Sequence, residues 1–249
     1  MDYLIIDGNN HAFMGASVAM NIAKDDNFED VLYNILTGMV QKIKKTFKGY
    51  KCFVCWDSYG GTHFRKELYP EYKATRNPSW IDFKAVENCK SIYELYGITS
   101  ITLPQCEGDD AIYALAKELS AKDEDSHIVL FSRDKDLIQV VQAGYADEVY
   151  DPHRKSMMTI PSYPVVMLKA LAGDSSDNIL GVKGIGEKTA IKVINGEKAL
   201  TESQKAEFER CLKVIDASLN PNLANNCEEI KKYIYNYCIT NYNKYRRKL

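Results

Sequence analysis

The sequence predicts an α/β protein in which a parallel sheet flanked by helices is followed by a smaller, wholly helical part. Short strand-like apolar runs alternate with helix-like runs through the first 160 residues, and this alternation is typical of a parallel sheet covered on both faces. From about residue 161 onward the strand signal ends. We therefore expect two domains, residues 1–160 and 161–249, joined at the polar, proline-bearing segment 151–164.

The expected strands are short and apolar, and most of them lead into an acidic residue. They lie at residues 3–6, 52–56, 98–103, 127–131 and 148–150. Between them, apolar residues three or four positions apart predict helices at residues 28–47, 83–96 and 110–119. The segment "DGNN" after the first strand is most simply a turn.

The composition is that of an ordinary globular protein, with 45% hydrophobic and 27% charged residues among 249. No apolar run approaches the roughly 20 residues of a membrane span, and the start "MDYLIIDGNNH" does not have the pattern of a signal peptide. Seven cysteines without framework spacing favour a reduced, cytoplasmic location. Cys52 and Cys55 lie on a predicted strand, where residues three apart face opposite sides, so a zinc site there is disfavoured.

Acidic residues gather where the predicted strands end. Asp7, Asp57, Glu107 and Asp134 each lie at or just beyond the end of such a strand. The carboxyl ends of parallel strands meet at one edge of a sheet, which is where ligands bind in open α/β folds. Further carboxylates nearby in the sequence are Asp109, Asp110, Asp136, Asp174 and Asp177.

Nine carboxylates can share one site only if cations neutralise them. Oxygen ligands without His or Cys suit Mg²⁺ or Mn²⁺, and two such ions could act on a phosphodiester. The simpler alternative is helix capping, since Asp109 and Asp110 open a predicted helix, where acidic residues are favoured.

A glycine-rich hairpin, "GVKGIGEKTAIKVI", begins at Gly181. We expect Gly184 and Gly186 to adopt backbone conformations closed to other residues, so that their amides and the next helix start form an anion pocket. Lys183 and Lys188 add charge suited to a DNA backbone. A plain helix–helix turn is the alternative. The net charge of residues 161–249 is positive, with 14 Lys and Arg against 10 Asp and Glu.

These segments together resemble the 5′ nucleases, the family of 5′→3′ exonucleases and flap endonucleases. The matching segments, in the order of that family, are "LIIDGNN", "CWD", "YPEYKATR", "EGDDAIYALA", "SRDKDLIQVV" and "LKALAGDSSDNILGVKGIGEKTA". The resemblance implies a PIN-like α/β domain with a helical arch at about residues 58–90, followed by a helix–three-turn–helix domain. Leu180 and Lys183 depart from prolines that are frequent in bacterial members, and the last 50 or so residues match no motif.

The resemblance also implies roles for individual residues. Asp7, Asp57, Glu107 and Asp109 would form a first metal site with Asp110 close by, and the second site would comprise Asp134, Asp136, Asp174 and Asp177. Lys73 and Arg76 would meet the scissile phosphate at the arch. The hairpin would hold duplex DNA, with K⁺ on the backbone carbonyls of Val182 and Ile185.

We therefore expect a monomeric, Mg²⁺-dependent nuclease, for which Mn²⁺ could substitute, acting on flapped, branched or nicked DNA. One alternative is a structure-specific DNA-binding protein of the same fold that cuts poorly. Another is a PIN-type ribonuclease. The complete acidic set argues against the first alternative, and the glycine hairpin argues against the second.

Overall fold

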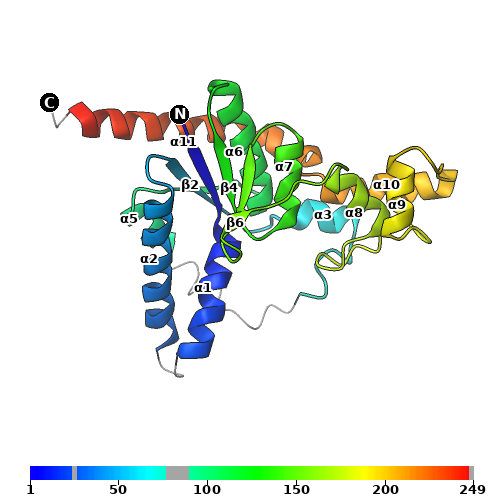
Figure 1. Ribbon diagram of the computed structural model, residues 1–249, viewed down its shortest axis with the longest axis horizontal. Helices are drawn as coiled ribbons and strands as arrows, with labels where there is room; N and C mark the ends of the chain where they lie inside the picture. Colours follow the sequence, from blue (N-terminus) through cyan, green and yellow to red (C-terminus); the bar gives the residue numbers. More distant parts are fainter. Residues whose placement is uncertain (24–26, 77–89, 247–249) are drawn as a thin grey trace.

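A six-stranded sheet lies at the centre of the computed structural model, which describes residues 1–23, 27–76 and 90–246 (Figure 1). Its strands, in the spatial order β3-β2-β1-β4-β5-β6, are β1 (Tyr3–Asp7), β2 (Lys51–Trp56), β3 (Thr99–Thr102), β4 (Ile128–Phe131), β5 (Glu148–Asp151) and β6 (Ser156–Met157). The first five are parallel, and β6 pairs antiparallel with β5. The predicted α/β class with a mostly parallel sheet is confirmed. The β6 strand was not predicted, because two residues carry no periodic pattern.

Helices cover the sheet and, together with loops and turns, form the remainder of the described chain. They are α1 (Gly8–Ile22), α2 (Phe28–Thr46), α3 (His63–Leu68), α5 (Lys90–Leu95), α6 (Gly108–Lys122), α7 (Ile138–Gln142), α8 (Val165–Ala172), α9 (Glu187–Ile194), α10 (Glu202–Ile215) and α11 (Asn222–Arg246). Two short 3₁₀ turns accompany them, η2 (Lys135–Leu137) and η3 (Ala217–Leu219).

The interpretation of "DGNN" as a turn is wrong, because α1 begins there. The Asp7 carboxylate caps this helix by accepting a hydrogen bond from the Asn10 amide at 2.9 Å. The buried side of α1 consists largely of small residues, and Gly15 lies so close to Leu36 that an added Cβ would stand 2.7 Å from a Leu36 methyl carbon. Glycine and alanine at a close helix–helix contact give little apolar periodicity, which explains why the pattern did not reveal the helix.

Side chains alternate across the strands and build one core on each face of the sheet. Leu4 and Ile6 of β1 pack on the side of α1 and α2, and Ile5 packs on the side of α6. Cys52 and Cys55 fall in these two opposite cores as expected, which separates their thiols by the sheet.

The chain after residue 160 has the expected helical character. Helices α8, α9 and α10 form a compact group at one end of the molecule, and α11 returns along α6 (Figure 1). The predicted helix at 83–96 is seen as α5 from residue 90, and its earlier part lies outside the described residues. The predicted arch at 58–90 is described only as far as Arg76, where α3 is followed by turns. Within the described ranges, no helix is both long and apolar enough to span a membrane.

Candidate active site

The carboxyl ends of the three central strands bring the predicted acidic residues together. Asp7 is the last residue of β1, Asp57 directly follows β2, and β2 and β1 are adjacent in the sheet. Asp134 follows β4 on the other side of β1 and caps η2. Glu107 caps α6, which places Asp109 in the first turn of that helix.

Four of these residues, Asp7, Asp57, Asp109 and Asp134, have no ion-pair partner among the residues that the structure describes, and we call them the unpaired carboxylates. Neutral donors hold three of them in place. Asp7 also accepts a 2.7 Å hydrogen bond from the Ser132 hydroxyl, and Asp57 accepts one from the Gly108 amide at 2.7 Å. The Asp134 carboxylate accepts one from the Asp136 amide at 2.9 Å.

The unpaired carboxylates have raised pKa values. Burial raises the pKa of Asp7 to about 7. The hydrogen bonds from Asn10 and Ser132 act to lower this pKa, and the negative charges of Asp134 and Asp57 raise it further. Burial also raises the pKa of Asp109 well above its usual range, and Asp134 and Asp7 add to the effect. The pKa values of Asp57 and Asp134 are raised by desolvation in spite of nearby lysines. These groups therefore repel one another in a partly dehydrated space, and a cation there would relieve the repulsion.

The other five acidic residues each pair with a basic side chain, and we call them the paired carboxylates: Glu107, Asp110, Asp136, Asp174 and Asp177. Lys73 pairs with Glu107, and Arg76 donates to Asp177 at 2.6 Å. The ammonium group of Lys169, on α8, donates hydrogen bonds to the carboxylates of both Asp136 and Asp174, and its distance to the Asp174 oxygen is 2.6 Å.

In two of the paired carboxylates, Glu107 and Asp174, the pKa is lowered rather than raised. The pKa of Glu107 is lowered although its burial acts to raise it, because Lys73 and Arg65 outweigh the burial. The pKa of Asp174 is lowered in the same way, by hydrogen bonds from Lys169 and Ser176 that outweigh desolvation. Both groups are thus ionised in the fold without any further cation.

Asp110 is held differently from its neighbour Asp109. Its two oxygens accept hydrogen bonds from both terminal nitrogens of Arg65, at 2.8 and 2.6 Å. They also accept hydrogen bonds from the side-chain amide of Asn220 at 2.8 Å and from the backbone N–H of Glu107 at 3.0 Å. Asp110 is fully buried. With these partners Asp110 supports the loop that carries Glu107, which agrees with the helix-capping interpretation.

Arg65, Tyr72 and Lys169 are components of the site that the sequence did not indicate. Arg65 is 4% exposed and also donates to the Val214 carbonyl of α10 at 2.8 Å. The Tyr72 hydroxyl donates to Glu107 at 2.8 Å. A signal existed for Lys169, because it is the single charged residue in the apolar helix "VVMLKALA", and a lone lysine in such a helix requires a partner.

The segment that carries Lys73 and Arg76 follows α3 and contacts the loop after α8, at Asp177 and Asn178. Lys73 has a left-handed backbone (φ 56°), and its amide donates to the Asp177 carbonyl at 2.9 Å. Asn178 donates in return to the Glu71 carbonyl at 2.8 Å. Both predicted phosphate-contacting residues therefore lie beside the carboxylates, with their charges directed at Glu107 and Asp177.

In the part of the chain that the structure describes, no three His, Cys, Asp or Glu side chains stand close enough together to hold a metal ion as placed. The ammonium groups of Lys73 and Lys169 lie among the paired carboxylates and neutralise part of their negative charge. The available donors are all carboxylate oxygens, which fits Mg²⁺ or Mn²⁺ in chemical type.

The hairpin at Gly181–Gly186 partly departs from the expectation. Gly184 has φ 77° and open space around it, as predicted. The prediction for Gly186 is wrong, because its backbone is extended (φ −91°) and any residue can adopt that conformation as the cap of α9. Val182 and Ile185 are buried and anchor the hairpin, whereas Lys183 and Lys188 are exposed.

Comparison with known proteins identifies the family. The sequence model for the N-terminal, resolvase-like domain of 5′-3′ exonucleases matches residues 2–163, and the one for their C-terminal SAM fold matches residues 160–234. The chain belongs to the 5′-3′ exonuclease family. The predicted family is thus confirmed, and with it an enzyme that hydrolyses DNA.

Two relatives of this 5′-3′ exonuclease family member show that similar sequences occur both in a shorter exonuclease and within a much longer DNA polymerase. A 5′-3′ exonuclease of Mycoplasmopsis pulmonis is 32% identical over 80% of this chain and 67% of its own length. DNA polymerase I of Bacillus subtilis is 32% identical over 92% of this chain. The chain spans only 26% of that polymerase, so the similarity concerns one part of it.

A solved structure supports the same fold. The bacteriophage T5 D15 flap endonuclease, solved as a pseudo-enzyme-product complex with DNA and metal ions, has a TM-score of 0.65. It is 20% identical, and the match covers 94% of this chain and 99% of that one.

Proposed function

We propose that this 5′-3′ exonuclease family member cuts phosphodiesters in branched or 5′-ended DNA, 5′ flaps included, with the help of two Mg²⁺ ions, for which Mn²⁺ can substitute. The observation that carries the proposal is the group of unpaired carboxylates: mutually repelling acids at the carboxyl edge of the sheet, of which Asp7 is buried, Asp109 and Asp134 are half-buried and Asp57 is exposed. Such an arrangement is unfavourable by itself and becomes favourable when cations bind. The metal ions and DNA in the T5 complex agree with it.

The unpaired carboxylates would contribute to both ions. Asp7, Asp57 and Asp109 would hold the first ion together with Glu107. Asp134 would hold the second, supported by Asp136, Asp174 and Asp177. Asp110 would position the Glu107 loop rather than contact an ion. Two divalent ions, when bound, stabilise charge on the attacking and leaving oxygens of a phosphodiester.

Lys73 and Arg76 would act on the substrate. Each is now bound to a carboxylate through a flexible side chain, and Arg76 is half-exposed. Once those carboxylates are neutralised, both cations are available to a phosphate at the same edge. A guanidinium and an ammonium fixed beside a phosphate stabilise the charge that develops on it during cleavage.

The hairpin would hold duplex DNA outside the reacting centre. The open space beside Gly184 permits a phosphate to approach the backbone, and Lys183 and Lys188 supply charge. The carbonyls of Val182 and Ile185 would bind K⁺ there. One chain supplies all nine carboxylates, so we propose that it acts as a monomer.

Incubating a labelled 5′-flap duplex with the protein in Mg²⁺, Mn²⁺ or EDTA tests the proposal. We expect cleavage in either metal and none in EDTA, with a 5′-phosphate on the product. Full cleavage in EDTA would refute the metal requirement. Binding of the flap without cleavage in either metal would instead favour the poorly cutting DNA-binding protein.

A further inference from the structure

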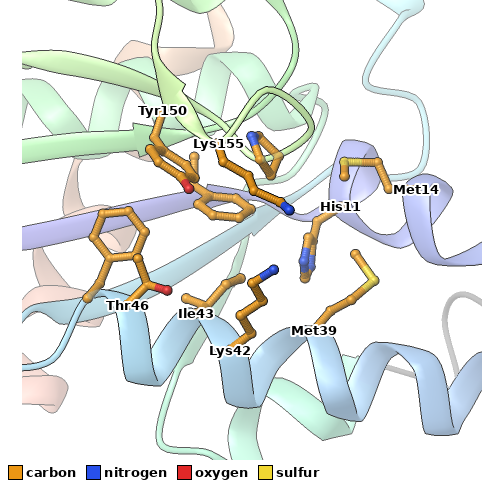
Figure 2. Close-up of a pocket in the computed structure, with 11 residues that line it drawn as sticks. His11, Met14, Met39, Lys42, Ile43, Thr46, Tyr150 and Lys155 are labelled. Atoms are coloured by element: carbon orange, nitrogen blue, oxygen red, sulfur yellow. The ribbon is translucent and has the colours of Figure 1, made fainter.

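A small cavity lies on the face of the sheet that α1 and α2 cover, between these helices and the ends of β4 and β5 (Figure 2). Its volume is about 150 Å³. An apolar cavity of about this size can hold one benzene molecule. None of the acidic residues of the candidate active site lines the cavity.

Aromatic rings form one wall of the cavity. Phe131 and Tyr150 stack with ring centres 5.5 Å apart, and Phe47 meets Tyr150 edge-to-face at 5.3 Å. The ring of His11 meets Phe131 edge-to-face at 5.4 Å. A further ring placed in the cavity would extend this cluster, because aromatic side chains favour such edge-to-face and offset contacts.

His11 is a neutral member of that wall. It is 2% exposed, and its Nδ1 shares a 2.8 Å hydrogen bond with the Tyr93 hydroxyl. Burial lowers the pKa of His11 to about 4, so the ring carries no charge at neutral pH. The wall therefore offers a ring surface and a polar nitrogen but no negative charge.

Two lysines supply positive charge at the same cavity. Figure 2 shows the ammonium groups of Lys42, from α2, and Lys155, from the β5–β6 turn, directed toward the space beside His11. Within the described ranges neither lysine has an ion-pair partner. Both residues are exposed, so their ammonium groups are hydrated in the free protein and remain available to an anion that lies between them.

The backbone of the β5–β6 turn holds the Cα of Lys155 at the edge of the cavity. This residue has a left-handed conformation (φ 57°), and its amide donates to the Asp151 carbonyl at 2.8 Å. The Asp151 carboxylate further accepts from the amides of His153 and Arg154, at 2.8 and 3.1 Å. A non-glycine residue in this conformation needs such support from its surroundings.

We propose that this cavity binds a small aromatic monoanion, with the ring against Phe131 and Tyr150 and the anionic group between Lys42 and Lys155. The aromatic wall would contact the ring of the ligand, and the two ammonium groups would bind its anionic group. Met14 and Met39 close the opposite side, and their flexible side chains can adapt to the substituents of the ring. This site is independent of the proposed nuclease reaction.

Benzoate is the probe that tests the proposal, with ¹³C-methyl-methionine NMR as the readout. In a benzoate titration the methyl resonances of Met14 and Met39 should shift together and saturate, while that of Met167, on α8 and outside the cavity, should not move. A ligand of this size should bind with a Kd on the order of 1 mM. Absence of a saturable shift at Met14 and Met39 would overturn the proposal.

Matched ligands and variants separate ring recognition from simple anion binding. Benzamide, which is neutral, and inorganic phosphate, which lacks a ring, should each bind at least about tenfold more weakly than benzoate. Lys42→Met with Lys155→Met should weaken benzoate binding by a similar factor, whereas Lys45→Met, on the same helix but outside the cavity, should not. Equal binding of phosphate, or unchanged benzoate binding in the double variant, would overturn the proposal.

Discussion

The paired and the unpaired carboxylates occupy one edge of the sheet but have opposite electrostatic states. Glu107 and Asp174 have protein cations beside them and lowered pKa values. Asp7 and Asp109 have no ion-pair partner among the described residues, and burial raises both pKa values, that of Asp109 in spite of the nearby Lys73 charge. The protein thus neutralises one half of the site with lysine and arginine and leaves the other half for a cation from solution. This difference separates residues that stabilise the fold from residues that need a metal ion.

The largest effect is expected for an unpaired carboxylate. Asp134→Asn should lower the cleavage rate on the order of a thousandfold, because a metal ligand supports several kcal/mol of charge stabilisation in the transition state. Single-turnover cleavage of a 5′-flap duplex measures this. DNA binding in Ca²⁺ should remain near that of wild type, and a variant that cuts within tenfold of wild type would contradict the assignment.

Lys73→Ala tests whether a cation of the paired half also serves the reaction. We expect a loss of about a hundredfold in the single-turnover rate, since removing one charge-stabilising donor usually costs that much. Lys66→Ala, an exposed lysine on α3, provides the control. If Lys73 served only to neutralise Glu107, its loss would lower stability and leave the rate within a factor of two.

Asp109 and Asp110 are adjacent in the sequence but belong to different halves, so they allow a direct contrast in stability. Asp110→Asn removes the bidentate ion pair of the buried Arg65, which keeps only Glu107 as an acidic partner, and should cost about 3 kcal/mol of unfolding free energy. Asp109→Asn should cost none in EDTA, because it removes a repelled charge. Urea unfolding of both variants decides this, and equal losses would abolish the distinction.

The raised pKa of Asp7 predicts a pH dependence in the metal-free protein. The pKa rises from 3.8 when unfolded to about 7 when folded, so the folded form retains a proton that the unfolded chain has released. The contribution of Asp7 to stability is therefore fully present below about pH 4 and is lost as the pH rises through about 7. In EDTA at pH 8, Asp7→Asn should be more stable than wild type by up to about 4 kcal/mol, the free energy that corresponds to raising the pKa from 3.8 to about 7. The two proteins should converge near pH 4.

Melting curves at both pH values measure this difference. Millimolar Mg²⁺ should reverse the order at pH 8, since an ion that binds only the folded wild type stabilises it. A difference that is independent of both pH and metal would show that packing, rather than charge, separates the two proteins.

The smallest effects are expected at the hairpin, which contains no acidic ligand. Lys183→Ala and Lys188→Ala should each lower the salt dependence of DNA binding by about one unit of slope. Gly184→Val should weaken binding, whereas Gly186→Ala should be tolerated because its backbone is extended. Salt-titrated binding of the four variants tests this, and unchanged slopes for both lysine variants would leave the hairpin as a packing element.

The sequence revealed the parts of this site that depend on strand ends. Buried strands are apolar, so an acidic residue at the end of one is conspicuous, and parallel pairing determines that such residues meet. The partners were harder to foresee, because Arg65 reaches Asp110 and Val214 only through tertiary contacts between distant segments. The helix α1 was missed since its contacts use small residues, and the extended conformation of Gly186 cannot be distinguished in the sequence from the left-handed one of Gly184.

Arg65 also links the two parts of the chain that the two family models match. The same guanidinium group holds Asp110 on α6 and the Val214 carbonyl on α10. The core beneath the sheet also includes Ile230 and Ile234 of α11 beside residues of β1 and α6. A fragment ending near residue 160 would therefore expose part of that core and leave the Arg65 side chain short of an acceptor. Two separate family models match adjacent regions of this sequence, but the two regions share one core and the contacts of Arg65, so they form one interdependent unit that cannot be divided without damaging the site.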